Sequence, residues 1–161
     1  MPGPDLQMSS EDFAREAQPA YAALLALGKA VDESGLPKAL TELVKLRASQ
    51  INGCAFCAQL HLNVARKVEV ATEKLDLVAV WREAGVFDPR ERAALGWTEA
   101  LTRLDRPEAL EAARERLLSH FSPEEALHLT VAIGTINQWN RIAVALRFPP
   151  PILRRPAQAA Q

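Results

Sequence analysis

No stretch of the chain alternates apolar and polar residues with the two-residue period of a strand. Apolar residues fall instead on helical arcs, as Leu40, Leu43 and Leu46 do after the break at Gly35. Signals for helix starts and helix stops then divide the chain cleanly. The pattern predicts an all-α fold of about six to seven helices, over residues 11–32, 37–51, 54–67, 70–84, 89–104, 108–119 and 123–146.

The predicted boundaries depend on residues that favour helix ends. Ser10 is expected to cap the first helix, and Asn52-Gly53 separates the second helix from the third. Asp88-Pro89-Arg90-Glu91 and Ser122-Pro123-Glu124-Glu125 both have the form of a helix start, with proline in the first turn and glutamate two residues later. These signals make the fold prediction independent of any single hydrophobic stretch.

The last predicted helix is apolar on nearly all sides. It contains the run Ala126-Leu127-His128-Leu129-Thr130-Val131-Ala132-Ile133, and a helix without a polar face is usually buried all round. Such a helix is either central in its own chain or part of a subunit contact, and the sequence leaves both open. We expect a homo-oligomer (a dimer, trimer or hexamer) to which this helix contributes.

Length and charge narrow the class of protein. The 161 residues suit a single domain over 1–161, with a core in about 10–148 and a proline-rich tail, 149–161, that is extended or disordered. The net charge is -1, so the chain lacks the excess positive charge that is typical of proteins that bind nucleic acids or anionic membranes. Residues 1–13 lack the pattern of a signal peptide, and no apolar run is long enough to span a bilayer. We therefore expect a cytoplasmic protein.

The chemistry is concentrated in the chain's two cysteines, Cys54 and Cys57. With His61 they are spaced i, i+3 and i+7, so the three side chains lie within an arc of about 60° on one helix face. In a first helical turn, unpaired N–H groups and the helix dipole favour a thiolate. The second cysteine can then close a disulfide onto the oxidised first one. The spacing thus indicates a redox-active pair.

Other interpretations of these residues are weaker. The cysteines could be small apolar core residues, and His61 could be an ordinary core histidine. Cys-x-x-Cys with a histidine supplies three zinc ligands, but no second Cys-x-x-Cys is present, and His120 and His128 lie far downstream. A thioredoxin-like site would need β-α-β segments around the pair, and the pattern shows none. We expect no metal and no cofactor.

The predicted helix 37–51 carries two further residues of interest. Glu42 lies at the edge of its apolar arc, beside Lys45 and Ser49, which by itself predicts an exposed surface residue. Arg47 lies inside the arc, so its guanidinium must pair with a carboxylate or reach out to water. We expect Arg47 to be buried and paired.

At this point the chain resembles the alkylhydroperoxidase D (AhpD) family, also called the carboxymuconolactone decarboxylase family. The matching stretch is Glu42, then Arg47-Ala48-Ser49-Gln50-Ile51-Asn52-Gly53-Cys54-Ala55-Phe56-Cys57, then His61, with the spacing Glu-x11-Cys-x2-Cys-x3-His. Ile136-Asn137-Gln138-Trp139-Asn140-Arg141 resembles the end of single-domain members. One departure is Phe56, where the best-known members have a histidine.

The resemblance implies roles for the motif residues. Cys57 would be the peroxidatic cysteine, and Cys54 the resolving one and the more exposed of the two. Glu42 and His61 would relay the proton, which makes Glu42 a catalytic residue in spite of its place on the wheel. Peroxide would be the substrate and an external dithiol or lipoyl-bearing protein the reductant, in a trimer or hexamer of all-helical subunits.

The implied function is thus a thiol-dependent peroxidase that reduces hydrogen peroxide or organic hydroperoxides. Decarboxylation of a muconolactone is an alternative, but it needs no cysteine pair. A redox-sensing module is another, since it needs a reactive thiol without turnover.

Overall fold

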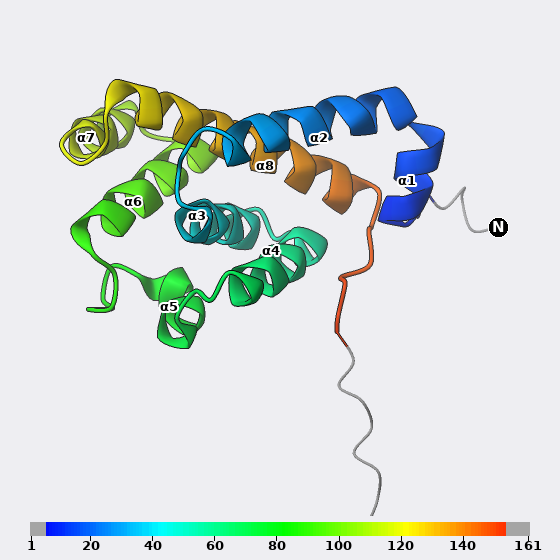
Figure 1. Ribbon diagram of the computed structural model, residues 1–161, viewed down its shortest axis with the longest axis horizontal. Helices are drawn as coiled ribbons and strands as arrows, with labels where there is room; N and C mark the ends of the chain where they lie inside the picture. Colours follow the sequence, from blue (N-terminus) through cyan, green and yellow to red (C-terminus); the bar gives the residue numbers. More distant parts are fainter. Residues whose placement is uncertain (1–5, 154–161) are drawn as a thin grey trace, which may run out of the picture.

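The computed structural model describes residues 6–153, which form eight α-helices and one 3₁₀ helix and contain no strand (Figure 1). The all-α prediction is confirmed, and the helix number is one higher than expected. The elements are α1 Ser10–Glu16, α2 Gln18–Asp32, α3 Lys38–Ile51, α4 Ala55–Lys67, α5 Thr72–Leu77, η1 Val78–Val80, α6 Pro89–Arg103, α7 Pro107–Leu118 and α8 Pro123–Ala145.

Two predicted helices differ from the structure. The segment 11–32 is not one helix, because the chain breaks at Ala17, just before Pro19 in the first turn of α2. Proline lacks an N–H and its ring clashes with the preceding turn, so it starts a helix more easily than it continues one. The segment 70–84 contains only α5 and η1.

The capping signals explain most of the other boundaries. Asp88 and Ser122 each form a capping box with the glutamate three residues later, as predicted. At the first helix, Ser9 rather than Ser10 is the cap, and it pairs reciprocally with Asp12. Each box satisfies N–H groups that would otherwise lack a partner at the helix start.

Helix α3 packs against α4, α6 and α8, and α2 runs alongside α8 (Figure 1). α3 therefore lies among helices that come from both halves of the chain. After α8, residues 149–153 form no helix, and the Asn63 side chain of α4 donates a hydrogen bond to the Pro151 carbonyl, 2.9 Å away. The rest of the predicted tail, 154–161, lies outside the described residues.

The predicted pairing of Arg47 is confirmed. Its side chain is only 12% exposed, and its guanidinium contacts the Glu99 carboxylate of α6 at 2.7 and 2.8 Å. Glu99 is itself buried, and it also accepts hydrogen bonds from Trp81, Arg82 and Arg103. Breaking such a pair typically costs about 3–5 kcal/mol, because a buried charge is left alone.

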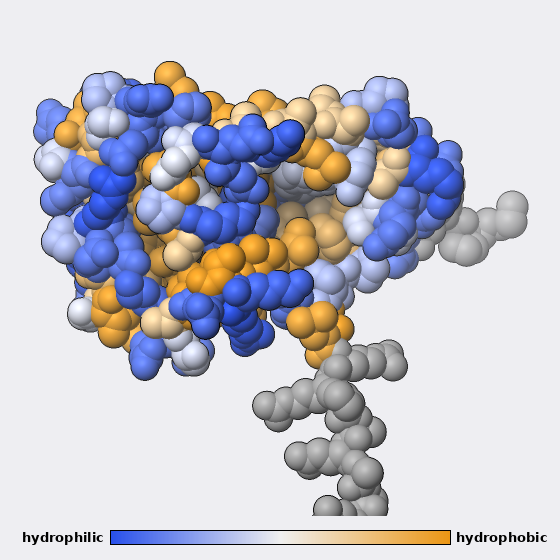
Figure 2. All heavy atoms as spheres, in the orientation of Figure 1, coloured by the Kyte–Doolittle hydropathy of each residue, from blue (hydrophilic) through white to orange (hydrophobic). Residues whose placement is uncertain are grey.

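Helix α8 is central but not enclosed. It contacts α2, α3, α4, α6 and α7, yet its Leu127 and Val144 are 58% and 49% exposed. In the single chain α8 is therefore central but not buried on every side, and its part in a subunit contact stays a prediction. Its neighbour α2 also exposes Leu25 and Leu27, at 51% and 41%, and apolar atoms are visible along it (Figure 2).

We propose that these apolar surfaces are covered in a homo-oligomer. Light scattering at micromolar concentration should give a mass that is a multiple of 17.7 kDa. Leu127→Glu should shift the protein toward the monomer, because a charge would be buried in the contact. Val80→Glu, at an exposed position of η1, is the matched control and should leave the mass unchanged. A wild-type mass near 17.7 kDa would rule out the oligomer.

Candidate active site

The turn between α3 and α4 places both cysteines. α3 ends at Ile51, and Gly53 has φ +65°, a left-handed conformation that favours glycine. Cys54 is the N-cap of α4, and its Sγ accepts a hydrogen bond from the Cys57 N–H at 3.2 Å. The predicted break and the predicted place of the cysteines at a helix start are therefore confirmed.

Both thiols are free and almost fully buried. Cys54 is 1% exposed and Cys57 is 2% exposed, so the expectation of a more exposed Cys54 is wrong. The reason lies in the tertiary packing, because apolar side chains from four helices and the segment after α8 enclose the pair. This cluster includes Phe13, Leu24, Ala48, Ile136, Ala143 and Phe148.

The two sulfurs differ sharply in acidity. The Cys57 thiol donates a hydrogen bond to Cys54 and, although burial acts in the opposite direction, the pKa of Cys54 falls from 9.0 to about 7. The backbone N–H of Cys57 contributes to this lowering. The pKa of Cys57 is raised well above its usual range, because its proton is shared with Cys54 and because the thiol is buried. When the pair loses one proton, the negative charge is therefore on Cys54.

Glu42 is buried, so the surface prediction from the helical wheel is wrong. Its side chain is 1% exposed, and its carboxylate lies 2.7 Å from His61 Nδ1, 3.0 Å from Lys45 Nζ and 3.2 Å from Lys38 Nζ. Burial raises the pKa of Glu42, but the hydrogen bond and charge of His61, followed by Lys45, outweigh it and lower the pKa to about 2. The carboxylate is therefore ionised at neutral pH.

His61 lies on the same helix as Cys57, one turn later, and its side chain is 14% exposed. The structure brings His61 together with Glu42, and Cys54 together with Cys57. Within residues 6–153, no hydrogen bond joins the imidazole to either sulfur. Proton transfer between the two pairs thus needs a bridging water or the substrate itself.

A further polar group, which the motif spacing does not reveal, comes from α8. Asn140 is 1% exposed and donates a hydrogen bond to Ser49 Oγ at 3.0 Å. The backbone carbonyl of Ser49 in turn accepts a hydrogen bond from the Cys54 N–H, also at 3.0 Å. Hydrogen bonding by the Asn140 side chain lowers the pKa of both cysteines. Only its nearness to the sulfurs in space could have pointed to it.

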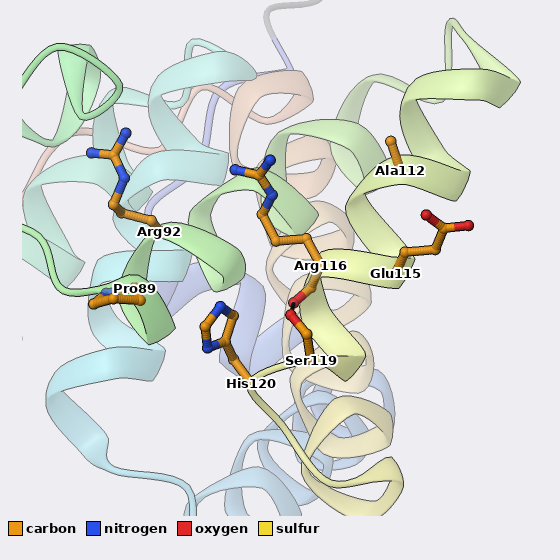
Figure 3. Close-up of a pocket in the computed structure, with 7 residues that line it drawn as sticks. All are labelled: Pro89, Arg92, Ala112, Glu115, Arg116, Ser119 and His120. Atoms are coloured by element: carbon orange, nitrogen blue, oxygen red, sulfur yellow. Dashed lines mark hydrogen bonds between the residues drawn. The ribbon is translucent and has the colours of Figure 1, made fainter.

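Two hollows lie elsewhere. One, of about 570 Å³, opens between α6 and α7 and is lined by Pro89, Arg92, Ala112, Glu115, Arg116, Ser119 and His120 (Figure 3). It contains neither cysteine, and its Arg92 guanidinium is bonded to backbone carbonyls. The other, of about 330 Å³, borders Ala55, Ala58 and Leu62 of α4, and neither cysteine nor His61 lines it.

Membrane-spanning helices and metal-binding clusters are both absent from the part of the chain that the structure describes. Among residues 6–153, no helix is long and apolar enough to cross a membrane. In the same range, no group of three or more His, Cys, Asp or Glu side chains is arranged to hold a metal ion.

Comparison with known proteins identifies the family. Residues 18–100 match the carboxymuconolactone decarboxylase family. The chain belongs to this AhpD-like family. It is 32% identical over 123 residues to the uncharacterised protein YdfG of Bacillus subtilis, covering 76% of this chain and 84% of YdfG. The predicted membership is therefore confirmed.

Solved structures agree with the family assignment. A protein of unknown function from Agrobacterium tumefaciens, suggested to be the antioxidant defence protein AhpD, is 44% identical with a TM-score of 0.83, covering 88% of this chain and 97% of that one. The debrominase Bmp8 has a TM-score of 0.73 at 20% identity, covering 84% and 73% of the two chains. At that identity the likeness concerns the fold alone, and it shows that this fold also hosts other chemistry.

The ionised Glu42 predicts an acid-dependent loss of stability. Its folded-state pKa of about 2 lies below the ordinary 4.5, so the folded state binds fewer protons than the unfolded chain. The stabilisation is therefore present above about pH 4.5 and is lost as the pH falls toward 2. At about 1.4 kcal/mol per pKa unit, it amounts to about 3 kcal/mol.

Denaturant unfolding across that pH window should show a steeper loss of stability in the wild type than in Glu42→Gln. Glu83→Gln, at an exposed carboxylate of the same charge, should follow the wild type. Equal slopes in the wild type and Glu42→Gln would contradict the assignment of Glu42 as an ionised buried group.

Proposed function

We propose that this protein is a thiol-dependent peroxidase that reduces hydrogen peroxide or organic hydroperoxides with the Cys54–Cys57 pair. The observation that carries the proposal is the buried pair itself, joined by a hydrogen bond at the start of α4, with the pKa of Cys54 lowered to about 7. A thiolate is the species that attacks an O–O bond, and an adjacent thiol resolves the product as a disulfide.

The proposed roles follow the family resemblance, with Cys57 as the peroxidatic cysteine and Cys54 as the resolving one. When the pair has lost one proton, the remaining proton is on Cys57 and the negative charge is on Cys54. Transfer of that proton to Cys54 places the charge on Cys57, one turn away from His61. The two thiols titrate as a unit, so this exchange needs no proton from outside the pair.

The chemical cycle balances with these groups. Cys57 thiolate attacks the peroxide, the O–O bond breaks, and Cys57 becomes a sulfenic acid. The departing oxygen takes a proton from His61, whose ring faces the Glu42 carboxylate at 2.7 Å, so that charge on the imidazole is compensated. Cys54 then attacks the sulfenic sulfur, and its proton leaves with the hydroxyl group as water. An external dithiol reduces the disulfide to two thiols, and the Cys57 proton then passes to His61, which restores the starting thiol, thiolate and imidazole proton.

The reductant is an external dithiol or a lipoyl-type group, and we place the protein in the reducing cytoplasm. Phe56, which replaces the histidine of the best-known relatives, packs edge-on against Phe148, with ring centroids 5.3 Å apart. Phe56 is half-buried and packs against the apolar cluster that contains both cysteines. A phenyl ring has no proton to donate, so Phe56 belongs to the apolar surroundings of the pair.

Two other functions remain as outcomes of the same assay. A muconolactone decarboxylase would consume no peroxide, and a redox sensor would consume one equivalent without turnover. Peroxide consumption in the presence of dithiothreitol separates all three, because only a peroxidase turns over repeatedly. The complete set of Cys54, Cys57, His61 and Glu42 in one buried region favours the peroxidase.

The cysteine variants test the roles. Cys57→Ser should abolish peroxide consumption, because it removes the attacking sulfur. Cys54→Ser should also stop turnover but leave Cys57 trapped as a sulfenic or sulfinic acid, visible by mass measurement. The wild type should lose two protons after mild peroxide treatment as the disulfide forms. A wild-type rate in Cys57→Ser would show that the roles are wrongly assigned.

The Glu42–His61 pair should act as one unit. Glu42→Gln and His61→Gln should each slow peroxide reduction by about 10²- to 10⁴-fold, the usual range for loss of a general acid or base. The double variant should be little slower than the slower single variant, because each residue works through the other. Glu83→Gln serves again as the control. An unchanged rate in Glu42→Gln would leave Glu42 with a structural role only.

A further inference from the structure

A chain of three buried or half-buried asparagines connects α8 to the cysteine turn. Asn52, at the end of α3, donates hydrogen bonds from its amide nitrogen to Oδ1 of both Asn137 and Asn140, each at 2.9 Å. Asn140 then donates to Ser49 Oγ at 3.0 Å. Each of these side-chain amides can be oriented in only two ways, with either its oxygen or its NH₂ group toward a given neighbour. The orientation of one amide therefore determines the orientation of the next.

The orientation of the Asn137 amide is fixed by neighbouring groups that can only donate or only accept a hydrogen bond. The Asn137 amide nitrogen donates to the Ile133 carbonyl at 2.9 Å, and a carbonyl can only accept. Arg141 donates to the Asn137 Oδ1 at 3.2 Å, and a guanidinium can only donate. Asn137 must therefore turn its oxygen toward Asn52. Asn52 must in turn present its NH₂ group, and Asn140 must receive it with Oδ1.

The other end of the chain requires the same direction. The Ser49 hydroxyl donates to the Lys45 carbonyl at 2.7 Å, so its oxygen is left to accept from Asn140. Asn140 is thus held from both sides with its oxygen toward Asn52 and its NH₂ toward Ser49 and the cysteine turn. Ser49 accepts one of the two amide hydrogens, and within residues 6–153 no hydrogen bond assigns the second one to an oxygen.

We propose that Asn140 is a further catalytic residue of the pair, whose amide NH₂, held in one direction by Asn52 and Asn137, donates a hydrogen bond to the sulfur that carries the negative charge. The inference deepens the proposed peroxidase function and rests on it. A fixed neutral donor suits this step, because the charge moves between two sulfurs during the cycle. The same amide lowers the pKa of both Cys54 and Cys57, which agrees with a donor placed within reach of either.

The test is a titration of thiolate ultraviolet absorbance in the reduced protein, which needs neither peroxide nor access of a label to the buried sulfurs. Asn140→Leu keeps the approximate size of the side chain but removes the donor. Its thiolate midpoint should rise by about one to two pH units, the range expected for loss of a hydrogen bond to a charged group. Gln138→Leu, on the exposed side of the same helix, should keep the wild-type midpoint.

Two further variants keep the test decisive if Asn140→Leu fails to fold. Asn140→Asp has the same shape with an acceptor in place of the donor, so its midpoint should also rise. Asn52→Leu leaves Asn140 in place but removes the hydrogen bond that fixes the orientation of its amide, so we expect a smaller rise in the thiolate midpoint. The other titratable or charged groups around the pair are unchanged in every variant, namely Glu42 and Lys45 of α3, His61 of α4, Arg141 of α8 and Tyr21 of α2.

Activity gives a second readout. Peroxide reduction by Asn140→Leu should be slow near neutral pH and should approach the wild-type rate above the new midpoint, where the thiolate forms again. A folded Asn140→Leu or Asn140→Asp with the wild-type midpoint would overturn the inference and reduce Asn140 to a packing role. A raised midpoint in a protein that consumes no peroxide would keep the inference and reject the proposed function.

Discussion

The tight turn at Asn52-Gly53 is the constraint on which the rest of the site depends. Because Gly53 adopts a left-handed backbone conformation, α4 folds back immediately against α3. That return places Cys54 at a helix start, where the N–H of Cys57 meets its sulfur. It also carries His61 to the side of α3 on which Glu42 lies. One backbone turn therefore assembles both the sulfur pair and the proton-handling pair.

Two carboxylates, those of Glu42 and Glu99, are buried in this protein, and they are held by different partners. Glu99 is held by the guanidinium of Arg47, which stays charged at any ordinary pH, so this pair ties α3 to α6 permanently. Glu42 is held by the ammonium groups of Lys38 and Lys45 and by the imidazole of His61. The two carboxylates are buried to a similar depth, so the difference between them lies in their partners.

The fold of this chain is shared with the debrominase Bmp8, whose sequence is only 20% identical. A likeness in fold therefore does not decide the reaction, and the side chains near the sulfurs must do so. Here the decisive feature is electrostatic. A neutral amide, a neighbouring thiol and a backbone N–H surround Cys54, so that one thiolate can exist among apolar side chains that would otherwise keep both sulfurs protonated.

The sequence by itself determined the features that arise within one segment. Capping residues such as Asp88 and Ser122 set helix starts, and the spacing of Cys54, Cys57 and His61 set a shared helix face, since both effects act over a few residues. The place of Arg47 within an apolar arc also predicted its pairing with a carboxylate. Glu42 and Asn140 show the limit. A helical wheel distinguishes apolar from polar positions but does not show which helix will cover a polar edge. Only the packing of α4 and α8 onto α3 decided that Glu42 is buried against His61 and that Asn140 is buried next to the cysteine turn.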